Sequence, residues 1–164
     1  MHETGVVNLP ASYFTKEYSA GKPDLKTLIE DIVSEFSLNA DQQRAFTLIA
    51  NHAGGVQAEP LRMFMGGMGG TGKSTVIHAL IEFCKRRGEE HRFIILAPTG
   101  TAAALLNGFT YHSVLGMGWG SNNGYADGSS VRNINDRLQG VEYIFINEIS
   151  MLNCGDLYRI SAHL

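Results

Sequence analysis

The sequence predicts an α/β fold in which helices flank a parallel β-sheet. Short apolar runs rich in β-branched and aromatic residues alternate with longer segments of helical periodicity, and a glycine-rich turn joins one such pair. Strands that alternate with helices along a chain pair in parallel. The 164 residues, 44% of them hydrophobic, suffice for one domain with a buried core.

Two helices are predicted first. Residues 24–36 repeat apolar side chains at helical spacing, with acidic residues on the opposite face. A second helix is predicted for about residues 40–52, because Asn39 has the pattern of an N-cap with the amide of Gln42 three residues later. The glycine pair that begins at Gly54 ends this helix.

The remaining elements alternate along the chain. Residues 61–65 form a short apolar run that stops at glycines, which favours a buried strand. A helix is predicted for residues 73–87, and the β-rich runs 93–97 and 141–146 are predicted strands. Residues 153–164 have helical spacing but no stop signal, so we expect the chain to be a fragment of a longer protein.

Charge, hydrophobicity and cysteine spacing argue against several classes of protein. A formal net charge of −3 and a pI near 6.0 argue against attraction of the whole surface to a nucleic-acid backbone. This charge still allows nucleic acid to bind in a narrow groove. No apolar run is long enough to span a membrane. Cys84 and Cys154 lack metal-ligand spacing, and no secretory signal opens the sequence, which predicts a reducing, intracellular compartment.

A phosphate-binding motif precedes the helix at 73–87. Residues 67–74 read G-M-G-G-T-G-K-S and fit G-x-x-x-x-G-K-[ST]. Small residues let backbone N–H groups face phosphate oxygens, Lys73 reaches the outer phosphates, and the Ser74 hydroxyl ligates Mg²⁺. The predicted nucleotide-binding residues of this loop are Gly67, Gly69, Gly70, Thr71, Gly72, Lys73, Ser74 and Thr75.

The same glycines also satisfy the dinucleotide pattern G-x-G-x-x-G. That fold requires an acidic residue about twenty positions on, near the end of the second strand, to hold a ribose hydroxyl. Here the second strand ends in Leu96, Ala97 and Pro98. Since Lys73 and Ser74 have a role only in a triphosphate site, we favour that interpretation.

A predicted strand delivers Asn147 and Glu148 at its carboxyl end, where ligands bind in α/β folds. The arrangement resembles a Walker B element, in which an aspartate holds Mg²⁺ and the next glutamate orients the attacking water. The Asn147 amide can accept a hydrogen bond from a metal-bound water but brings no negative charge. We therefore expect retained nucleotide binding, weakened Mg²⁺ affinity and slower hydrolysis, with a strand-end turn of no function as the alternative.

Several blocks follow one another in the order found in a known family. They are residues 38–42, 67–74, 97–103, 108–113 and 147–151. On these blocks the chain resembles the petite integration frequency (Pif-type) DNA helicases, five-prime to three-prime motors of superfamily one. It departs from their G-x-T-I-H-S stretch at Tyr111 and from their D-E-I-S-M block at Asn147.

The resemblance implies a P-loop NTPase fold of the RecA-like type, with a parallel sheet flanked by helices. Residues 38–164 would be an incomplete first motor domain after the N-terminal segment 1–37, and the second motor domain would be absent. It further implies an ATP-dependent DNA helicase with ATP and Mg²⁺ as cofactors, acting in DNA repair, recombination or telomere maintenance in the nucleus or mitochondrion of a eukaryote. This fragment would bind nucleotide without unwinding DNA.

The resemblance also assigns roles to single residues. Gln42 would read the adenine, since an amide can pair with its adjacent donor and acceptor. Lys73 and Glu148 would be catalytic, and Ser74 and Asn147 would hold the metal. The residues expected to hold single-stranded DNA are Thr99, Gly100, Thr110, His112 and Ser113. A non-catalytic nucleotide-binding module and a small-molecule kinase are the alternative functions, although a kinase leaves residues 108–113 unexplained.

Other candidates have plainer interpretations. His112 could instead be a core residue. Trp119 and Tyr125 could stack on bases, but a flexible surface insertion is favoured. The basic run 85–87 could track a nucleic-acid backbone, but a solvated helix end is favoured because basic side chains complement the helix dipole there.

Overall fold

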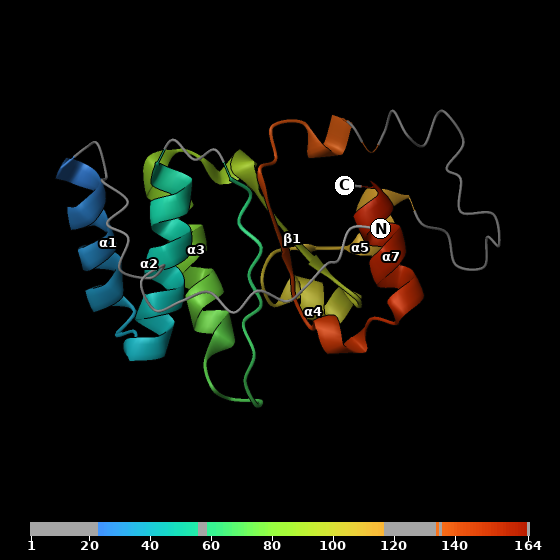
Figure 1. Ribbon diagram of the computed structural model, residues 1–164, viewed down its shortest axis with the longest axis horizontal. Helices are drawn as coiled ribbons and strands as arrows, with labels where there is room; N and C mark the ends of the chain where they lie inside the picture. Colours follow the sequence, from blue (N-terminus) through green and yellow to red (C-terminus); the bar gives the residue numbers. More distant parts are fainter. Residues whose placement is uncertain (1–22, 56–58, 117–133, 135, 164) are drawn as a thin grey trace. The chain divides into compact units, whose positions relative to one another are not determined.

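The computed structural model describes residues 23–55, 59–116, 134 and 136–163 (Figure 1). The chain divides into two compact units, Met1–Phe83 and Cys84–Leu164. The boundary between them, after Phe83, falls within the helix Lys73–Arg87.

Three helices lie side by side in the N-terminal unit: α1 (Pro23–Glu35), α2 (Ala40–Gly54) and α3 (Lys73–Arg87) (Figure 1). All three were predicted, and their observed bounds lie within a few residues of the expected ones. The buried rings of Phe46 on α2 and Phe83 on α3 meet edge to face, with centroids 6.1 Å apart. This contact fixes α2 against α3 through an apolar core.

The predicted start of α2 is confirmed in atomic detail. The Asn39 side chain accepts a hydrogen bond from the backbone N–H of Gln42 at 3.0 Å, and the Gln42 Oε1 accepts one from the backbone N–H of Asn39 at 3.0 Å. Each bond satisfies a donor that would otherwise lack a partner at the helix end. The reciprocal pair holds the first turn of α2 and the Gln42 side chain in one arrangement.

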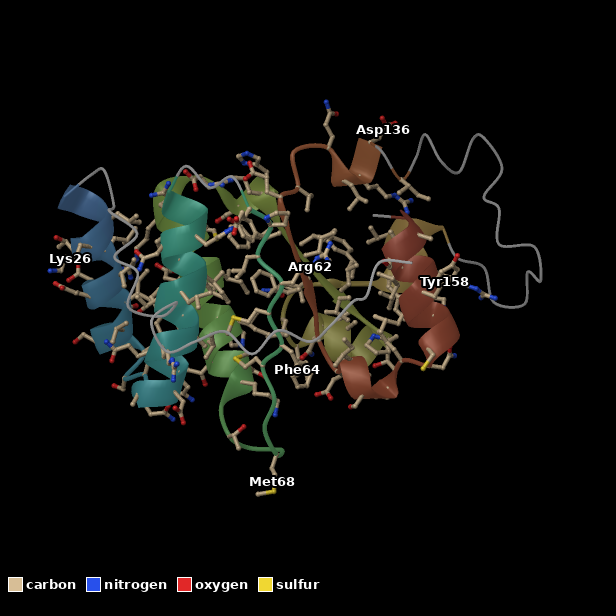
Figure 2. All side chains as sticks on the ribbon, in the orientation of Figure 1. Lys26, Arg62, Phe64, Met68, Asp136 and Tyr158 are labelled. Carbon is tan, nitrogen blue, oxygen red and sulfur yellow. The ribbon has the colours of Figure 1, made fainter. Side chains whose placement is uncertain are left out.

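The strand predicted for residues 61–65 is wrong. This run joins none of the three strands in the described sheet. Met63 is 43% exposed and Phe64 is 76% exposed, and Figure 2 shows the Phe64 side chain on the extended segment that precedes the phosphate loop. Apolar composition favours a strand only when neighbouring backbone groups are available to pair with it.

The C-terminal unit contains a parallel sheet, as predicted. Its strands are β1 (Phe93–Ala97), β2 (Phe109–Thr110) and β3 (Tyr143–Ile146), in the order β2-β1-β3. Leu96 of β1 lies beside Phe109 of β2 and also beside Ile146 of β3. The central strand β1 therefore aligns the carboxyl ends of both neighbours with its own.

Helices α4 (Gly100–Ala104), α5 (Tyr111–Leu115) and α7 (Cys154–His163) accompany the sheet. The helix predicted at the end of the sequence is confirmed as α7. Helices α4 and α5 and strand β2 were not predicted, because elements this short do not show a hydrophobic period. Buried side chains of β1, α5 and α7, together with Ile134, form one cluster: Ile94, Leu96, Tyr111, Val114, Leu115, Ile134 and Ile160. None of the helices in the described ranges has the length and apolar character needed to span a bilayer.

The two cysteines of the sequence are both free thiols. Cys84 is buried, and burial is the main reason why its pKa rises to about 12. The thiol therefore stays protonated and unreactive at neutral pH. Cys154 at the start of α7 is exposed.

An ion-pair network lies where β1 and β3 begin. The Arg92 guanidinium donates to Glu89 at 2.5 Å and to Glu142 at 2.7 Å, and Arg87 at the end of α3 donates to Glu89 at 2.8 Å. The rings of Phe93 and Tyr143 stack beside it at 4.6 Å. The other two residues of the basic run 85–87 are exposed in the last turn of α3, as expected for a solvated helix end.

Glu89 should make the fold sensitive to acid. The hydrogen bond from Arg87, followed by that from Arg92, holds the pKa of Glu89 below its ordinary value. A group with a lowered pKa in the folded state stabilises the fold above its unfolded pKa of about 4.3, and this contribution disappears as the pH falls through the folded pKa. We expect Glu89→Gln to lower the free energy of unfolding by about 1 kcal/mol at about pH 7. Its difference from wild type should shrink toward about pH 3 in urea titrations.

The control is Glu90→Gln, which removes the same charge from an exposed neighbour. We expect this variant to unfold like wild type at every pH. A Glu89→Gln difference that did not change with pH would contradict the assigned ion pair.

Candidate functional site

The phosphate loop, residues 67–74, connects the segment that contains Phe64 to α3 through unusual backbone conformations. Gly67, Gly70 and Gly72 have φ values of +155°, +79° and +79°. Side chains disfavour this region, and glycine enters it without strain. The Met68 side chain is 82% exposed, and Figure 2 shows it at the tip of the loop. The glycines of the motif are therefore required by the shape of the turn itself.

Lys73 folds back along the loop from the first residue of α3. Its Nζ donates to the carbonyl oxygen of Gly67 at 2.7 Å and to that of Met68 at 2.9 Å. The Thr71 hydroxyl donates to the same Met68 oxygen at 2.9 Å. These bonds hold an ammonium group beside the loop backbone, at the positive end of a helix of fifteen residues.

The donor groups of this loop fit a triphosphate with Mg²⁺. A Cβ placed on Gly69 or Gly70 would meet nothing within 4 Å, so this backbone faces open space that a ligand can approach. The Ser74 hydroxyl is exposed in the first turn of α3, and the Thr75 N–H donates to the Gly72 oxygen at 3.1 Å. An ammonium, a hydroxyl and a helix N-terminus are the groups that phosphate–metal sites use.

The Gln42 side chain contacts the phosphate loop. Its Nε2 donates to the carbonyl oxygens of Thr71 and Gly72, each at 3.3 Å. The family resemblance implies a role toward adenine for this residue, and its hydrogen bonds to the loop were not foreseen.

Two of the three strand ends in the C-terminal unit lead directly into helix caps. After β1, the Thr99 hydroxyl accepts a hydrogen bond from the Ala102 N–H at 3.2 Å and caps α4, whose first residue is Gly100. After β2, the Thr110 hydroxyl accepts one from the Ser113 N–H at 3.3 Å and caps α5. The two threonines predicted to hold DNA, Thr99 and Thr110, thus each cap the start of a helix.

Strand β3 delivers Asn147 and Glu148 at its carboxyl end, as predicted. The Asn147 N–H donates to the Leu96 carbonyl of β1 at 2.8 Å and prolongs the strand pairing. Glu148 is exposed and has a left-handed backbone, with φ 55° and ψ 44°. Because the three strands are parallel, the residues that follow Ala97, Thr110 and Ile146 share one edge of the sheet.

Gly108 has a packing role that the sequence did not reveal. A Cβ at this position would lie 2.6 Å from the carbonyl oxygen of Ile95. Strand β2 can thus lie against β1 only because Gly108 has no side chain. The glycine that opens the block at residues 108–113 is needed for the sheet.

Tyr111 is a core residue with a satisfied hydroxyl. It is 3% exposed, and its hydroxyl donates to the Asp156 Oδ2 at 3.1 Å. Burial, and then this hydrogen bond, raise the pKa of Tyr111 to about 12. Asn153 donates to the same oxygen at 2.8 Å, so both residues anchor the start of α7. Sequence reasoning missed Asp156, because the N-cap spacing from Asn153 gives no sign of a tyrosine partner.

His112 stacks on the Tyr111 ring, with centroids 3.9 Å apart. It is half-buried, so it is neither a fully enclosed core residue nor a free surface group. The exposed Ser113 follows it on α5, and its hydroxyl donates to the Thr110 oxygen at 2.8 Å. Trp119 and Tyr125, the candidate base-stacking residues, lie outside the described residues.

The donors predicted for Mg²⁺ lie in different units, Ser74 in the N-terminal one and Asn147 in the C-terminal one. Within the described ranges, no group of three or more His, Cys, Asp and Glu side chains could hold a metal ion.

Comparison with known proteins identifies the family. The family model of PIF1-like helicases matches residues 37–159. The chain belongs to the PIF1-like helicase family. The match covers the phosphate loop, both threonine caps and the end of β3. No solved structure matches the chain at a significant level.

Curated helicases of this family are similar over most of the chain. The ATP-dependent DNA helicase Pif1 of Bdellovibrio bacteriovorus is 33% identical over 123 residues, which are 73% of this chain and 25% of that protein. The ATP-dependent DNA helicase PIF1 of Trypanosoma brucei brucei is 30% identical over 159 residues, 93% of this chain and 15% of that protein. The chain therefore spans a quarter or less of these PIF1-like relatives.

The loop geometry predicts that two glycines of the same loop, Gly69 and Gly72, differ in their tolerance of a side chain. We expect Gly72→Ala to lower the free energy of unfolding by at least about 1 kcal/mol, because of its left-handed backbone. In addition, its Cβ would lie 2.2 Å from the Gln42 Nε2. Gly69→Ala is the matched control, with open space around the new methyl group and an expected change within about 0.5 kcal/mol. Equal losses in urea titrations of the two variants would contradict this geometry.

Proposed function

We propose that this chain is the ATP-binding part of a DNA helicase motor. The observation that carries the proposal is the loop at residues 67–74. Its left-handed glycines and the Lys73 ammonium lie together at the start of α3, in a chain of the PIF1-like helicase family. In this proposal residues 38–164 belong to a RecA-like motor domain, and the protein couples ATP hydrolysis to movement along single-stranded DNA.

The loop residues hold the triphosphate in this proposal. Backbone N–H groups from Gly67 to Gly72 face the phosphate oxygens, and the Lys73 ammonium exchanges its carbonyl partners for the outer phosphates. The Ser74 hydroxyl would be a ligand of Mg²⁺, which would neutralise charge on the phosphates when it is bound. Thr75 supports the turn through its bond to Gly72.

Glu148 orients the attacking water, since it supplies an exposed carboxylate at the strand end. Asn147 precedes it and accepts a hydrogen bond from a metal-bound water without adding charge. The half-buried position of Asn147 and its backbone bond to Leu96 support a fixed orientation for this pair.

The DNA-binding residues of the proposal come from the β1 and β2 ends. Thr99 and Gly100 follow β1, and Thr110, His112 and Ser113 end β2 and begin α5. Hydroxyl groups, backbone N–H groups at helix starts and an imidazole are suited to phosphate contacts that position a strand without reading its sequence. The net charge of −3 fits a local contact of this kind rather than attraction by the whole surface.

A second function, a nucleotide-binding module without hydrolysis, is favoured by Asn147. Loss of the aspartate charge weakens the hold on the metal, while the loop at 67–74 keeps every group that grips a triphosphate. Nucleotide-dependent DNA affinity without ATP turnover would select this function.

Nucleotide binding tests the proposal directly. We expect isothermal titration calorimetry with Mg²⁺ and ATP to show binding, and Lys73→Ala to weaken it by about tenfold or more, as expected for loss of a charged hydrogen bond. The control is Lys85→Ala, which removes an exposed lysine from the last turn of the same helix and should bind ATP like wild type. If wild type gives no heat, the proposed function is wrong.

Asn147→Asp should restore the missing charge. We expect the Mg²⁺ concentration needed for half-maximal ATP binding to fall severalfold, because a carboxylate attracts the hydrated cation. In the full-length protein the ATPase rate should rise. Asn107→Asp is the control, since it adds the same charge at an exposed position outside the proposed site. An unchanged Mg²⁺ dependence and ATPase rate in Asn147→Asp would contradict the assigned role.

A further inference from the structure

We propose that Arg137 supplies the positive charge of the DNA-binding site at the end of β2, where its guanidinium binds a backbone phosphate of single-stranded DNA. This inference rests on the proposed function and deepens it, because it adds a residue and a ligand group to the same site. Arg137 lies outside every sequence motif described above.

The residues proposed to hold DNA carry no fixed positive charge. They offer hydroxyl groups, backbone N–H groups and an imidazole: Thr99, Gly100, Thr110, His112 and Ser113. Each phosphate of a single strand carries a negative charge, and protein affinity for it comes largely from lysine and arginine side chains that displace counterions. A site on a chain with a net charge of −3 therefore needs a local cation.

Arg137 reaches this site from a distant part of the sequence. Its Nη1 donates a hydrogen bond to the carbonyl oxygen of Ser113, across 24 positions of the chain. Ser113 lies in the second half of α5, where carbonyl groups lack partners within the helix. The bond thus brings the guanidinium against the helix that carries His112 and Ser113.

The segment that contains Arg137 is held by apolar packing on both sides of this residue. Ile134 is 4% exposed and belongs to the same buried cluster as Val114 and Leu115 of α5, and Leu138 packs against that cluster. Arg137 itself is exposed. Its neighbours therefore set its place beside α5, while its side chain stays accessible to a ligand.

Helix α5 is fixed by contacts of its own. The Thr110 hydroxyl caps its first turn, and the Tyr111 hydroxyl donates to Asp156 of α7 at 3.1 Å. Because both the helix and the segment beside it are held, the charge of Arg137 has a defined position relative to His112. A preformed group of this kind loses little conformational entropy when a strand binds.

Most of the donors of Arg137 remain for a ligand. A guanidinium has five N–H donors in a planar fork, and the Ser113 carbonyl takes one of them. Among the residues that the structure describes, no carboxylate pairs with Arg137, whereas Arg92 binds both Glu89 and Glu142. A fork that is not neutralised within the protein fits two oxygens of one phosphate.

The plain structural role for Arg137 is that of a cap for α5, because basic side chains often bind the last carbonyl groups of a helix. Such a cap requires the bond to Ser113 and no ligand. The two roles differ in how DNA affinity depends on salt. Only a group that neutralises a phosphate releases a counterion when DNA binds.

Three variants separate the charge from the cap. Arg137→Gln removes the charge and keeps an amide donor. Arg137→Lys keeps the charge and a donor but loses the planar fork. Lys26→Gln is the matched control, since it removes the same charge from an exposed side chain on α1, outside the proposed DNA site.

The measurement is the affinity of the full chain for fluorescently labelled oligo-dT and oligo-dC, read by fluorescence anisotropy over a series of NaCl concentrations. We expect Arg137→Gln to weaken binding about threefold to tenfold at low salt. The slope of log affinity against log salt should become shallower by about 0.7, the value for one phosphate contact on a single strand. Arg137→Lys should keep the wild-type slope, and Lys26→Gln should bind like wild type.

Both oligonucleotides should lose affinity by the same factor in Arg137→Gln, because a phosphate contact does not read the base. A loss confined to one of them would overturn the inference. A wild-type slope in Arg137→Gln would overturn it as well, and the proposed function would stand if wild type binds DNA. If wild type binds neither oligonucleotide, the DNA-binding part of the proposed function fails together with this inference.

Discussion

The hydrogen-bond ladder between β1 and its two parallel neighbours is the constraint on which the C-terminal unit depends. It brings the ends of three strands to one edge, and there Thr99, Thr110 and Asn147 each begin a turn or a helix. The ladder itself requires Gly108, because any side chain there would meet the β1 backbone. The sequence blocks that resemble the family are thus needed in part for the three strands to pair. The alignment of the strands then determines where the polar residues at their ends lie.

The helices could be predicted because their signals are local. The cap formed by Asn39 and Gln42 and the helix beginning at Lys73 depend on residues within one turn. The strand prediction for residues 61–65 was wrong because apolar composition alone does not show whether a segment is buried and paired. Phe64 in this segment is exposed. Helices of five residues such as α4 and α5 are too short for a period to appear.

The candidate site was predictable at the level of motifs and less so at the level of contacts. The motif places Lys73 at the loop and the apolar run places Glu148 at a strand end, and both positions are found. Contacts between distant segments have no such pattern. Tyr111 and Asp156 lie 45 positions apart, and Gln42 and Gly72 lie 30 apart. An amide or hydroxyl can serve a ligand or the protein itself, and only the folded arrangement shows which partner is near.

The left-handed backbone of Glu148 sets the stability of the turn after β3 against the presence of a carboxylate there. A residue with a Cβ loses about 1 kcal/mol in this conformation, which glycine would recover. Glycine would give a sturdier turn but would remove the carboxylate next to Asn147. A protein selected for robustness alone would therefore drift toward glycine here. Under the proposed function, the carboxylate that orients water accounts for a glutamate at a position where the backbone favours glycine.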